Sequence, residues 1–440
     1  AAVTAARGAL DGDWGRSTAA ERADVIDRLY ALFLERSDDL ANLITAEVGS
    51  PLLFSHFGQV GATGMALDYF AKLTRSFAFE EVRDGMMGPA LVRHEPVGVC
   101  AGIVPWNVPL FISMLKLAPA LAGGSTIVLK PAPETPLSAN ALAQMCIDAG
   151  VPDGVVNIVP AGRETGQHLV THPDVDKVSF TGSTAAGRKI GAACGELLRR
   201  CTLELGGKSA AIICDDADLD AIMPELIAAS TMNNGQACVA QTRILATRSR
   251  YDEVVEALTE AVAAIPVGDP ANMETGCGPL IAERQRERVE GYIQAGRDEG
   301  ARVTTGGGRP EGLDRGWFVE PTVFADVDNS MRIAQEEIFG PVLAVIAVDD
   351  ADDAVRVAND SAYGLSGTVW TADADAGLDI ARKVRTGTYT VNGFAMEWGA
   401  PFGGFKDSGV GRELGPEGLA AYLESKTINL PAGTEPTLAY

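Results

Sequence analysis

The sequence VGVCAGIV at residues 97–104 begins a succession of short apolar runs that decides the fold class. STIVL follows at 125–129, VVNIV at 155–159 and KVSF at 177–180, and these runs alternate with helical stretches such as residues 138–149. Short apolar strands that alternate with helices are typical of a parallel sheet covered by helices on both faces. The sequence therefore predicts an α/β protein.

The alternation starts again at residues 209–213, where a second group of strand-like runs begins. Further runs lie at 321–324, 341–348 and 387–391, and they predict a second α/β domain. The three glycines at 306–308 have no strand before them and no helix after them, so we interpret them as a surface turn rather than a phosphate loop.

Two segments do not follow this alternation. The chain is irregular between Phe70 and His94, and the tail after Leu423 contains short strand-like pieces. Together these segments predict a small bridging sheet.

The start of the chain predicts a long amphipathic helix, because Thr18 and Glu21 have the spacing of a capping box. The chain begins without Met, and we expect further N-terminal residues to precede it.

The composition excludes several classes of protein. The 440 residues carry a formal net charge of -23, whose field repels phosphate and argues against nucleic acid or a membrane as a partner. No apolar run reaches the roughly 20 residues that span a bilayer, and residues 1–13 lack a signal-peptide pattern, so we expect a cytoplasmic protein. The cysteines form no C-x-x-C pair, which argues against a disulfide framework and a structural metal. They are Cys100, Cys146, Cys194, Cys201, Cys214, Cys238 and Cys277.

One cysteine, Cys238, lies in the polar turn NGQACV at residues 234–239. A lone cysteine is more often an inert buried thiol than a nucleophile. Glu204, however, interrupts an apolar strand just before a Gly-Gly turn, where desolvation would suit it to proton abstraction. A salt-bridged or solvated carboxylate is the alternative.

Three other motifs place polar groups at the ends of strands. FTGSTAAG at 180–187 passes from a strand through a glycine turn into a helix, where anions bind, although it is also a common capping sequence. Lys130 ends another strand, and Asn107 is held between two prolines, where its amide could stabilise an oxyanion or a turn. Glu337 lies in QEEIFGP at 335–341, which alone is typical of a solvated turn.

Taken together, these motifs resemble those of the aldehyde dehydrogenase superfamily over essentially the whole chain, in the same order and with the same spacing. The matching segments are PWN at 105–107, KP at 130–131, FTGS at 180–183, ELGGK at 204–208, GQAC at 235–238, EIFGP at 337–341 and PFGG at 401–404.

The resemblance implies a Rossmann-like cofactor domain, a second α/β catalytic domain and a small bridging β element for oligomerisation, in a homodimer or homotetramer. On this basis the cofactor domain comprises residues 1–72 and 97–206, the catalytic domain residues 207–408, and the bridging segments residues 73–96 and 425–440.

The resemblance also implies the roles of the catalytic residues. Cys238 would be the nucleophile and Glu204 the base that activates water, while Asn107 and the Cys238 backbone N–H would form the oxyanion hole. Glu424 and Lys116 match positions that relay protons from Glu204. The implied reaction is the NAD(P)-dependent oxidation of a small-molecule aldehyde to a carboxylic acid through a thioester.

Cofactor and substrate contacts follow in the same way. The implied cofactor-binding residues are Ile103, Val104, Pro105, Trp106, Lys130, Gly162, Gly166, Phe180, Thr181, Gly182, Ser183, Leu205, Gly206, Glu337 and Phe339. The implied lining of the aldehyde tunnel is Val108, Leu115, Ala237, Val239 and Phe402.

Two departures from the family's pattern bear on specificity. Val108 and Leu115 replace aromatic residues of some relatives, so the tunnel should be wider or more aliphatic, and the physiological aldehyde is not determined by the sequence. Pro133 stands where many NAD-preferring relatives carry a glutamate; because Glu134 and the net charge disfavour a further phosphate, we expect NAD to be preferred and NADP to be usable.

Two other functions compete with this one. A CoA-acylating dehydrogenase would not need Glu204 as a base for water. A binding protein that had lost catalysis would not be expected to retain Cys238, Glu204 and Asn107 together.

Overall fold

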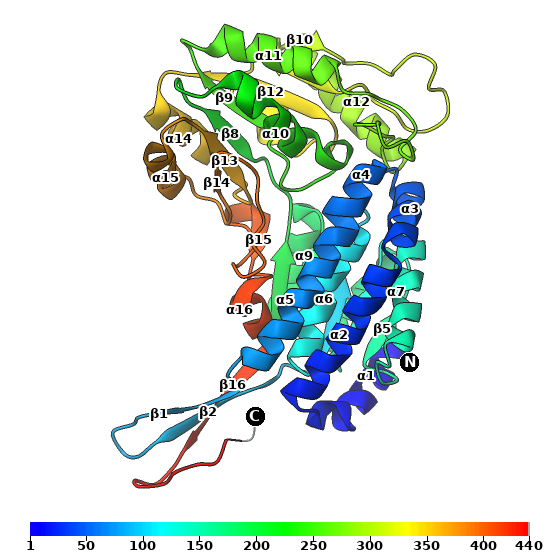
Figure 1. Cartoon of the computed structure of the whole chain (residues 1–440), viewed down its shortest axis with the longest axis vertical. Helices are drawn as coiled ribbons and strands as arrows, with labels where there is room; N and C mark the ends of the chain where they lie inside the picture. The colour runs from blue at the N-terminus through cyan, green and yellow to red at the C-terminus, as the bar shows by residue number, and fades with distance from the viewer. Residues whose placement is uncertain (439–440) are drawn as a thin grey trace.

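A computed structural model describes residues 1–438, and these residues form three β-sheets with helices packed around two of them (Figure 1). The predicted α/β class is confirmed. The two helix-covered sheets lie one above the other in Figure 1, and the third projects from the lower one.

The first sheet has the strand order β15-β7-β6-β3-β4-β5. Strands β3 to β7 pair in parallel, and the short β15 pairs antiparallel with β7. The strands are β3 (Val99–Ile103), β4 (Thr126–Lys130), β5 (Val156–Ile158), β6 (Lys177–Thr181), β7 (Arg200–Glu204) and β15 (Gly409–Val410). The first four coincide with the apolar runs that the sequence predicts.

Helices cover both faces of this sheet, because its central strands bury both sets of alternating side chains. On one face lie α2 (Ala19–Glu35), α3 (Ser37–Val48), α4 (Leu52–Phe54), a π-helical turn (Ser55–Gly61), α5 (Ala62–Ser76), α6 (Pro109–Ala122) and α7 (Pro136–Asp148). On the other lie α1 (Ala2–Asp11), α8 (Arg163–Thr171) and α9 (Thr184–Glu196). The predicted capping box of Thr18 and Glu21 is present at the start of α2.

The second sheet has the order β10-β11-β12-β9-β8-β13-β14. Its strands are β8 (Ala210–Ile213), β9 (Arg243–Thr247), β10 (Arg302–Thr305), β11 (Thr322–Ala325), β12 (Val342–Val348), β13 (Gly367–Trp370) and β14 (Thr390–Val391). Helices α10 (Leu219–Thr231) and α11 (Tyr251–Ala263) cover one face. The other face packs against α12 (Glu283–Asp298), α13 (Arg332–Gln335), α14 (Ala351–Asn359) and α15 (Ala374–Lys383).

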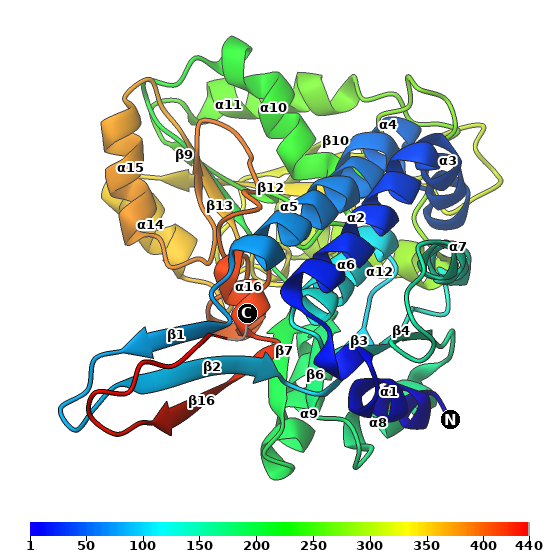
Figure 2. The same cartoon turned by 60° about the horizontal axis from the view of Figure 1, so that its bottom comes forward.

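The third sheet is the predicted bridging element. Strands β1 (Glu80–Arg83) and β2 (Ala90–Pro96) form a hairpin, and β16 (Leu423–Asn429) pairs antiparallel with β2 after the short helix α16 (Gly415–Ala420). Figure 2 shows this sheet extending away from the body of the protein. The predicted domain limits, and a role of this sheet in oligomerisation, stay predictions.

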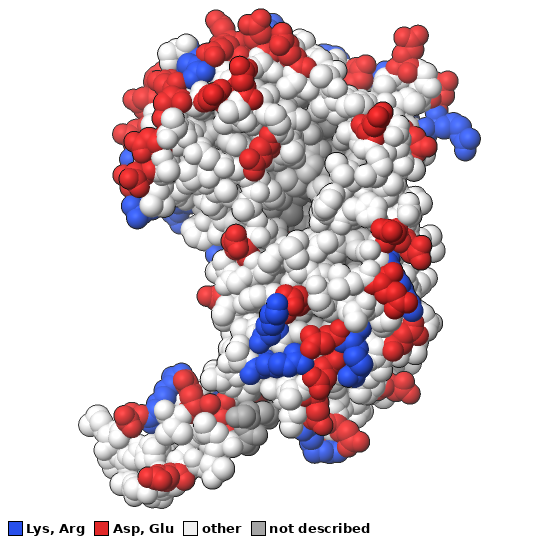
Figure 3. Space-filling view, viewed as in Figure 1, with Lys and Arg blue, Asp and Glu red and all other residues white. Residues whose placement is uncertain are grey.

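Charge is distributed unevenly over the surface. In the face drawn in Figure 3, Asp and Glu gather over the upper part of the molecule, which contains the second sheet and its helices. The hollow between the upper and lower parts is bordered mainly by uncharged residues.

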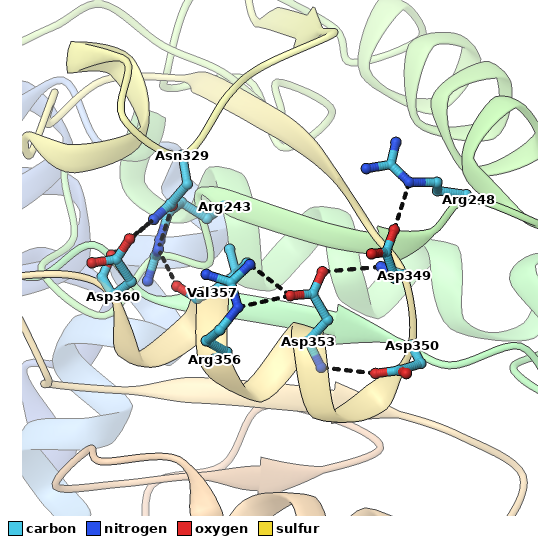
Figure 4. Close-up of polar contacts among 9 residues, drawn as sticks. All are labelled: Arg243, Arg248, Asn329, Asp349, Asp350, Asp353, Arg356, Val357 and Asp360. Carbon is cyan, nitrogen blue, oxygen red and sulfur yellow. Dashed lines mark hydrogen bonds and ion pairs between the residues drawn. The ribbon is translucent and has the colours of Figure 1, made fainter.

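A buried arginine connects strand β9 of the second sheet to helix α14, which packs on that sheet. The Arg243 guanidinium donates to the Val357 carbonyl oxygen at 3.1 Å (Figure 4). It also donates to the Ala358 carbonyl oxygen at 2.9 Å, and so satisfies the C-terminal end of α14. At the other end of α14, the Asp350 carboxylate accepts from the Asp353 amide at 2.9 Å. These bonds fix the helix that packs behind the central strands.

Candidate active site

The turn that carries Cys238 follows α10 and has a constrained backbone. Asn233 and Asn234 have φ values of 53° and 61°, and Gly235 has a φ of 70°. A Cβ atom on Gly235 would lie 2.2 Å from the Gly340 carbonyl, so only glycine fits there. The Asn234 amide holds the turn by donating to the Gly49 and Pro279 carbonyl oxygens at 2.8 and 3.0 Å.

Cys238 itself is partly buried at the end of this turn, and its side chain lines a cavity. Burial raises the pKa of the thiol well above its ordinary value, and the nearby Glu337 and Glu204 carboxylates raise it further. The backbone N–H groups of Cys238 and Val239 act in the opposite direction. The Cys238 thiol therefore ionises readily only if neighbouring groups stabilise the thiolate.

Asn107 lies beside this turn and is 3% exposed. Its side-chain amide donates to the Gln236 backbone carbonyl oxygen at 2.8 Å, and its backbone carbonyl oxygen accepts from the Asn233 side-chain amide at 2.9 Å. A primary amide has two N–H donors, so one remains to face the cavity.

Glu204 ends β7 and is buried, with an exposed fraction of 2%. Within residues 1–438, neither carboxylate oxygen has a hydrogen-bond partner of good geometry. Burial raises the pKa of Glu204 well above its ordinary value, as does the Glu413 carboxylate, while Lys116 and Arg412 lower it. A desolvated carboxylate of this kind is suited to take a proton from water.

Glu413, which was not predicted, is the acid that lies next to Lys116. The Lys116 ammonium donates to Glu413 Oε1 and to Thr181 Oγ1, each at 2.7 Å. Both members of the ion pair are buried, with side chains 0% and 1% exposed. The segment GREL at residues 411–414 puts an acid into a turn between β15 and α16, but nothing in the sequence alone shows that it points inward.

The prediction that Glu424 relays protons from Glu204 is wrong. Its carboxylate accepts from the Arg200 guanidinium at 2.7 and 3.0 Å, and its side chain is 43% exposed. Glu424 lies in β16 opposite Glu95, and this strand belongs to the projecting sheet. The structure therefore brings Lys116, but not Glu424, together with Glu204.

A cavity of about 240 Å³ joins the Cys238 turn to the carboxyl ends of the first sheet. Trp106 and Phe339 meet edge to face across it, with ring centroids 5.3 Å apart. Ser183 is the N-cap of α9, and its hydroxyl accepts from the Ala186 amide at 3.4 Å. The predicted residues that line the cavity are Pro105, Trp106, Asn107, Val108, Thr181, Gly182, Ser183, Leu205, Gly206, Cys238, Glu337 and Phe339.

The backbone of Gly206 and Gly207 fixes the position of the Glu337 carboxylate in this cavity. Its Oε1 accepts from the Gly207 amide at 2.9 Å, and a Cβ atom on Gly206 would lie 2.7 Å from its other oxygen. Burial raises the pKa of this carboxyl, while the Gly207 amide lowers it.

The other predicted cofactor residues lie outside the lining of this cavity. A Cβ atom on Gly166 would contact Lys130 Cδ at 3.3 Å and Ile103 Cδ1 at 3.9 Å, so these three residues are neighbours. Val104 and Phe180 are buried in the core, and Gly162 precedes α8 as its N-cap.

Three residues that line the cavity were not predicted. They are Ile112, Gln285 and Arg288. Gln285 donates to the Phe339 carbonyl oxygen at 2.7 Å, and Arg288 donates to the Ile338 carbonyl oxygen at 3.2 Å. Both come from α12, whose polar sequence is typical of any exposed helix and gives no sign of this role.

The predicted tunnel residues belong to one apolar cluster. Leu115 is 0% exposed, Val239 and Phe402 are buried, and Val108 and Ala237 are partly buried beside them. Phe111 and Trp398 add an edge-to-face pair to this cluster, with centroids 5.8 Å apart.

Two structural features are absent from the described part of the chain, residues 1–438. No helix there is long and apolar enough to cross a membrane. No group of three or more His, Cys, Asp or Glu residues there could hold a metal ion.

Comparisons with known proteins agree with one another. The model of the Aldehyde dehydrogenase family matches residues 1–428. Geranial dehydrogenase of Castellaniella defragrans is 49% identical over 431 residues, which cover 98% of this chain and 90% of the relative.

Solved structures are similar over the same length. An aldehyde dehydrogenase of Mycobacterium tuberculosis complexed with NAD+ has a TM-score of 0.97 at 53% identity, with 99% of this chain and 90% of that chain covered. A mutant of aldehyde dehydrogenase C from Pseudomonas syringae, complexed with NAD+ and octanal, has a TM-score of 0.95 at 41% identity, with 99% and 89% covered.

Proposed function

Because this chain belongs to the aldehyde dehydrogenase family, we propose that it oxidises an aldehyde to a carboxylic acid with NAD, through a thioester on Cys238. The observation that carries this proposal is the shared cavity, in which Cys238 and Asn107 meet Glu337 and the start of α9. A nucleophile and an oxyanion donor thus face the place where a dinucleotide would lie.

The residues of the cavity fit NAD. The N-terminus of α9 presents backbone N–H groups for the pyrophosphate, Glu337 would accept from one ribose, and Lys130, at the end of β4, is assigned to the other. When bound, NAD supplies the hydride acceptor. The Trp106 and Phe339 rings wall the same cavity.

The first half of the reaction is assigned to Cys238 and Asn107. The thiolate attacks the aldehyde carbonyl carbon, and the free N–H of the Asn107 amide together with the Cys238 backbone N–H stabilises the developing oxyanion. Loss of hydride from this thiohemiacetal leaves a thioester on Cys238.

The second half is assigned to Glu204. Its carboxylate takes a proton from water, the hydroxide attacks the thioester, and the acid leaves as the Cys238 thiol or thiolate is restored. Lys116 and Glu413, which flank Glu204 in the buried network, are assigned to receive the proton from it.

The apolar lining of the tunnel favours uncharged aliphatic aldehydes as substrates. Leu115 and Val108 supply alkyl surface, and Phe111 and Trp398 extend it. Two relatives that share much of this sequence are a geranial dehydrogenase and an aldehyde dehydrogenase C, a mutant of which was solved with octanal.

We expect octanal and geranial to be oxidised with a kcat/KM about tenfold or more above that of betaine aldehyde, because a cation would be desolvated among these side chains. NADH absorbance and product analysis, with and without CoA, measure this directly. Acid formation that requires CoA would indicate an acylating enzyme instead, and an equal rate with betaine aldehyde would contradict the substrate class.

Cofactor choice depends on the loop after Lys130. Pro133 is exposed and offers no carboxylate to a ribose, whereas Glu134 forms an ion pair with Arg284. Burial lowers the pKa of Lys130, and Glu134 raises it. Arg284 is thus engaged with Glu134, which leaves the loop with little positive charge for a 2′-phosphate.

We expect the wild type to prefer NAD, and Pro133→Glu to increase this preference by about tenfold, because a carboxylate there would bond the ribose hydroxyls and repel a 2′-phosphate. Dissociation constants of NADH and NADPH from fluorescence titration, together with kcat/KM for NAD and NADP, check it. A wild-type preference for NADP, or unchanged discrimination in Pro133→Glu, would show that this position does not face the ribose.

A further inference from the structure

The two donors of the proposed oxyanion hole come from different segments of the chain. Asn107 lies between β3 and α6, whereas Cys238 lies at the end of the turn that follows α10. An oxyanion donor stabilises a transition state only if it is already held in place when the charge develops. Contacts that join these two segments therefore bear directly on the reaction.

Asn233 joins the two segments with one side chain. Its Nδ2 atom donates to the Asn107 backbone carbonyl oxygen at 2.9 Å and to the Gln236 backbone carbonyl oxygen at 3.3 Å. The Asn107 Nδ2 atom donates to the same Gln236 oxygen at 2.8 Å. A carbonyl oxygen has two lone pairs, so it can accept both bonds. The Asn233 amide thus spans the backbone of Asn107 and the acceptor of the Asn107 side chain.

The surroundings of Asn233 determine which end of its amide faces these two oxygens. The residue is 2% exposed, and its Oδ1 atom has no hydrogen-bond partner of good geometry within residues 1–438. The opposite orientation would place Oδ1 against two carbonyl oxygens, with which it can form no hydrogen bond. Burial of an unpaired acceptor is unfavourable, which indicates that the two donor bonds have a use.

The backbone around Asn233 supports the same arrangement. Asn233 has a φ of 53°, in the left-handed region that asparagine adopts more readily than most residues other than glycine. Its backbone carbonyl oxygen accepts from the Gln236 amide at 3.0 Å, which closes the turn. From the other side, the Nε2 atom of Gln59 in the π-helical turn lies 3.5 Å from the Asn107 carbonyl oxygen. Such turns are frequent at functional sites.

We propose that Asn233 is a positioning residue of the oxyanion hole, which fixes the Asn107 side chain so that its remaining N–H faces the aldehyde oxygen. This inference rests on the proposed attack of Cys238 on an aldehyde. Asn233 is not part of the cavity lining in the described chain, so it acts through Asn107 and not on the substrate. Its loss should slow formation of the oxyanion and leave the nucleophile unchanged.

The test compares Asn233→Gly with Asn107→Ala and with the double variant. Glycine removes the amide and is compatible with a φ of 53°. NADH formation is followed by stopped flow in a single turnover, with saturating NAD and enzyme in excess over octanal. We expect it to be about tenfold slower in Asn233→Gly and about a hundredfold slower in Asn107→Ala, which loses the donor itself. The double variant should be no slower than Asn107→Ala.

Alkylation of Cys238 by iodoacetamide separates the oxyanion hole from the nucleophile. In this reaction the thiolate forms the new C–S bond as iodide leaves, and no oxyanion develops. Mass spectrometry of the peptide that contains Cys238 should therefore give the wild-type alkylation rate in Asn233→Gly. Asn233→Asp keeps the shape of the side chain and replaces the donor nitrogen with oxygen, so this second variant should slow NADH formation in the same way.

Asn392→Gly is the matched control. Asn392 also has a positive φ, of 54°, and its amide donates to a backbone carbonyl oxygen, that of Thr371, at 2.8 Å. Because this bond lies beside the second sheet and not at the Cys238 turn, both rates should stay within about twofold of the wild type.

Three results would overturn the positioning role. They are a wild-type rate of NADH formation in both Asn233 variants, equal slowing of NADH formation and alkylation, and a double variant slower than Asn107→Ala by the full effect of Asn233→Gly. If Asn107→Ala slows NADH formation while the Asn233 variants do not, this inference alone is wrong. If Asn107→Ala itself reacts like the wild type, the proposed oxyanion hole fails as well.

Discussion

Replacement of Cys238 by serine is expected to reduce NADH formation to less than about one hundredth of the wild-type rate, because a hydroxyl without an adjacent strong base is a far weaker nucleophile than a thiolate. Burial already raises the pKa of the thiol, and the same surroundings would keep a hydroxyl protonated. Oxygen is smaller than sulfur, so the turn and the cavity should be preserved. Steady-state NADH absorbance measures the loss, and NADH fluorescence titration measures cofactor binding, which should change little.

Cys277→Ser provides the control for this substitution. Cys277 is also buried, burial raises its pKa to about 12, and its thiol donates to the Gly278 carbonyl oxygen at 3.7 Å. We expect this variant to lose some thermal stability and to retain turnover. If Cys238→Ser kept a tenth of the wild-type rate, Cys238 would not be the nucleophile.

Strands β3, β4, β5 and β6 of the first sheet could be predicted because each lies in a short, mainly apolar run that is followed by a turn or a polar motif. Strands β9 and β13 escaped prediction for a physical reason. The strand β9 begins with Arg243, whose buried guanidinium is satisfied by carbonyl oxygens of α14, and this compensation depends on packing that is not visible in the local sequence. The short apolar segment of β13 gives a similarly weak signal.

The residues of the candidate site also divide into those that could be predicted from the sequence and those that could not. Cys238, Asn107 and Glu337 lie in turn motifs that are visible in the sequence, and these three residues line one cavity. Glu413 and Glu424 are both acids near the C-terminus, and only the path of the backbone determines which of them lies beside Lys116. Leu414, with a φ of 57°, follows Glu413 in a turn that directs the chain into α16, whereas Glu424 continues into the projecting sheet.

Glu204→Gln is expected to form NADH once and then to stall, because the amide cannot take a proton from water. The Glu204 carboxylate raises the pKa of the Cys238 thiol, so its removal should not by itself hinder ionisation of the nucleophile. Mixing with aldehyde and NAD should therefore give a burst of up to about one NADH per active site, with steady turnover reduced by about a hundredfold or more. Intact-protein mass spectrometry should detect the acyl adduct on Cys238.

The pH dependence of hydrolysis gives an independent check on the same residue. In the folded protein the pKa of Glu204 is raised above its ordinary value, so the carboxylate needed as a base is present only above that raised pKa, and adduct decay in the wild type should accelerate as the pH rises through it. Glu204→Asp keeps a carboxylate one methylene farther away and should show the same dependence at a lower rate, whereas Glu204→Gln should lose it. A Gln variant that turns over like the wild type would exclude Glu204 as the base. Absence of both burst and adduct in Glu204→Gln would instead mean that Glu204 also deprotonates Cys238. Hydroxylamine attacks thioesters without a base, so in that case it would find no thioester and could not increase turnover.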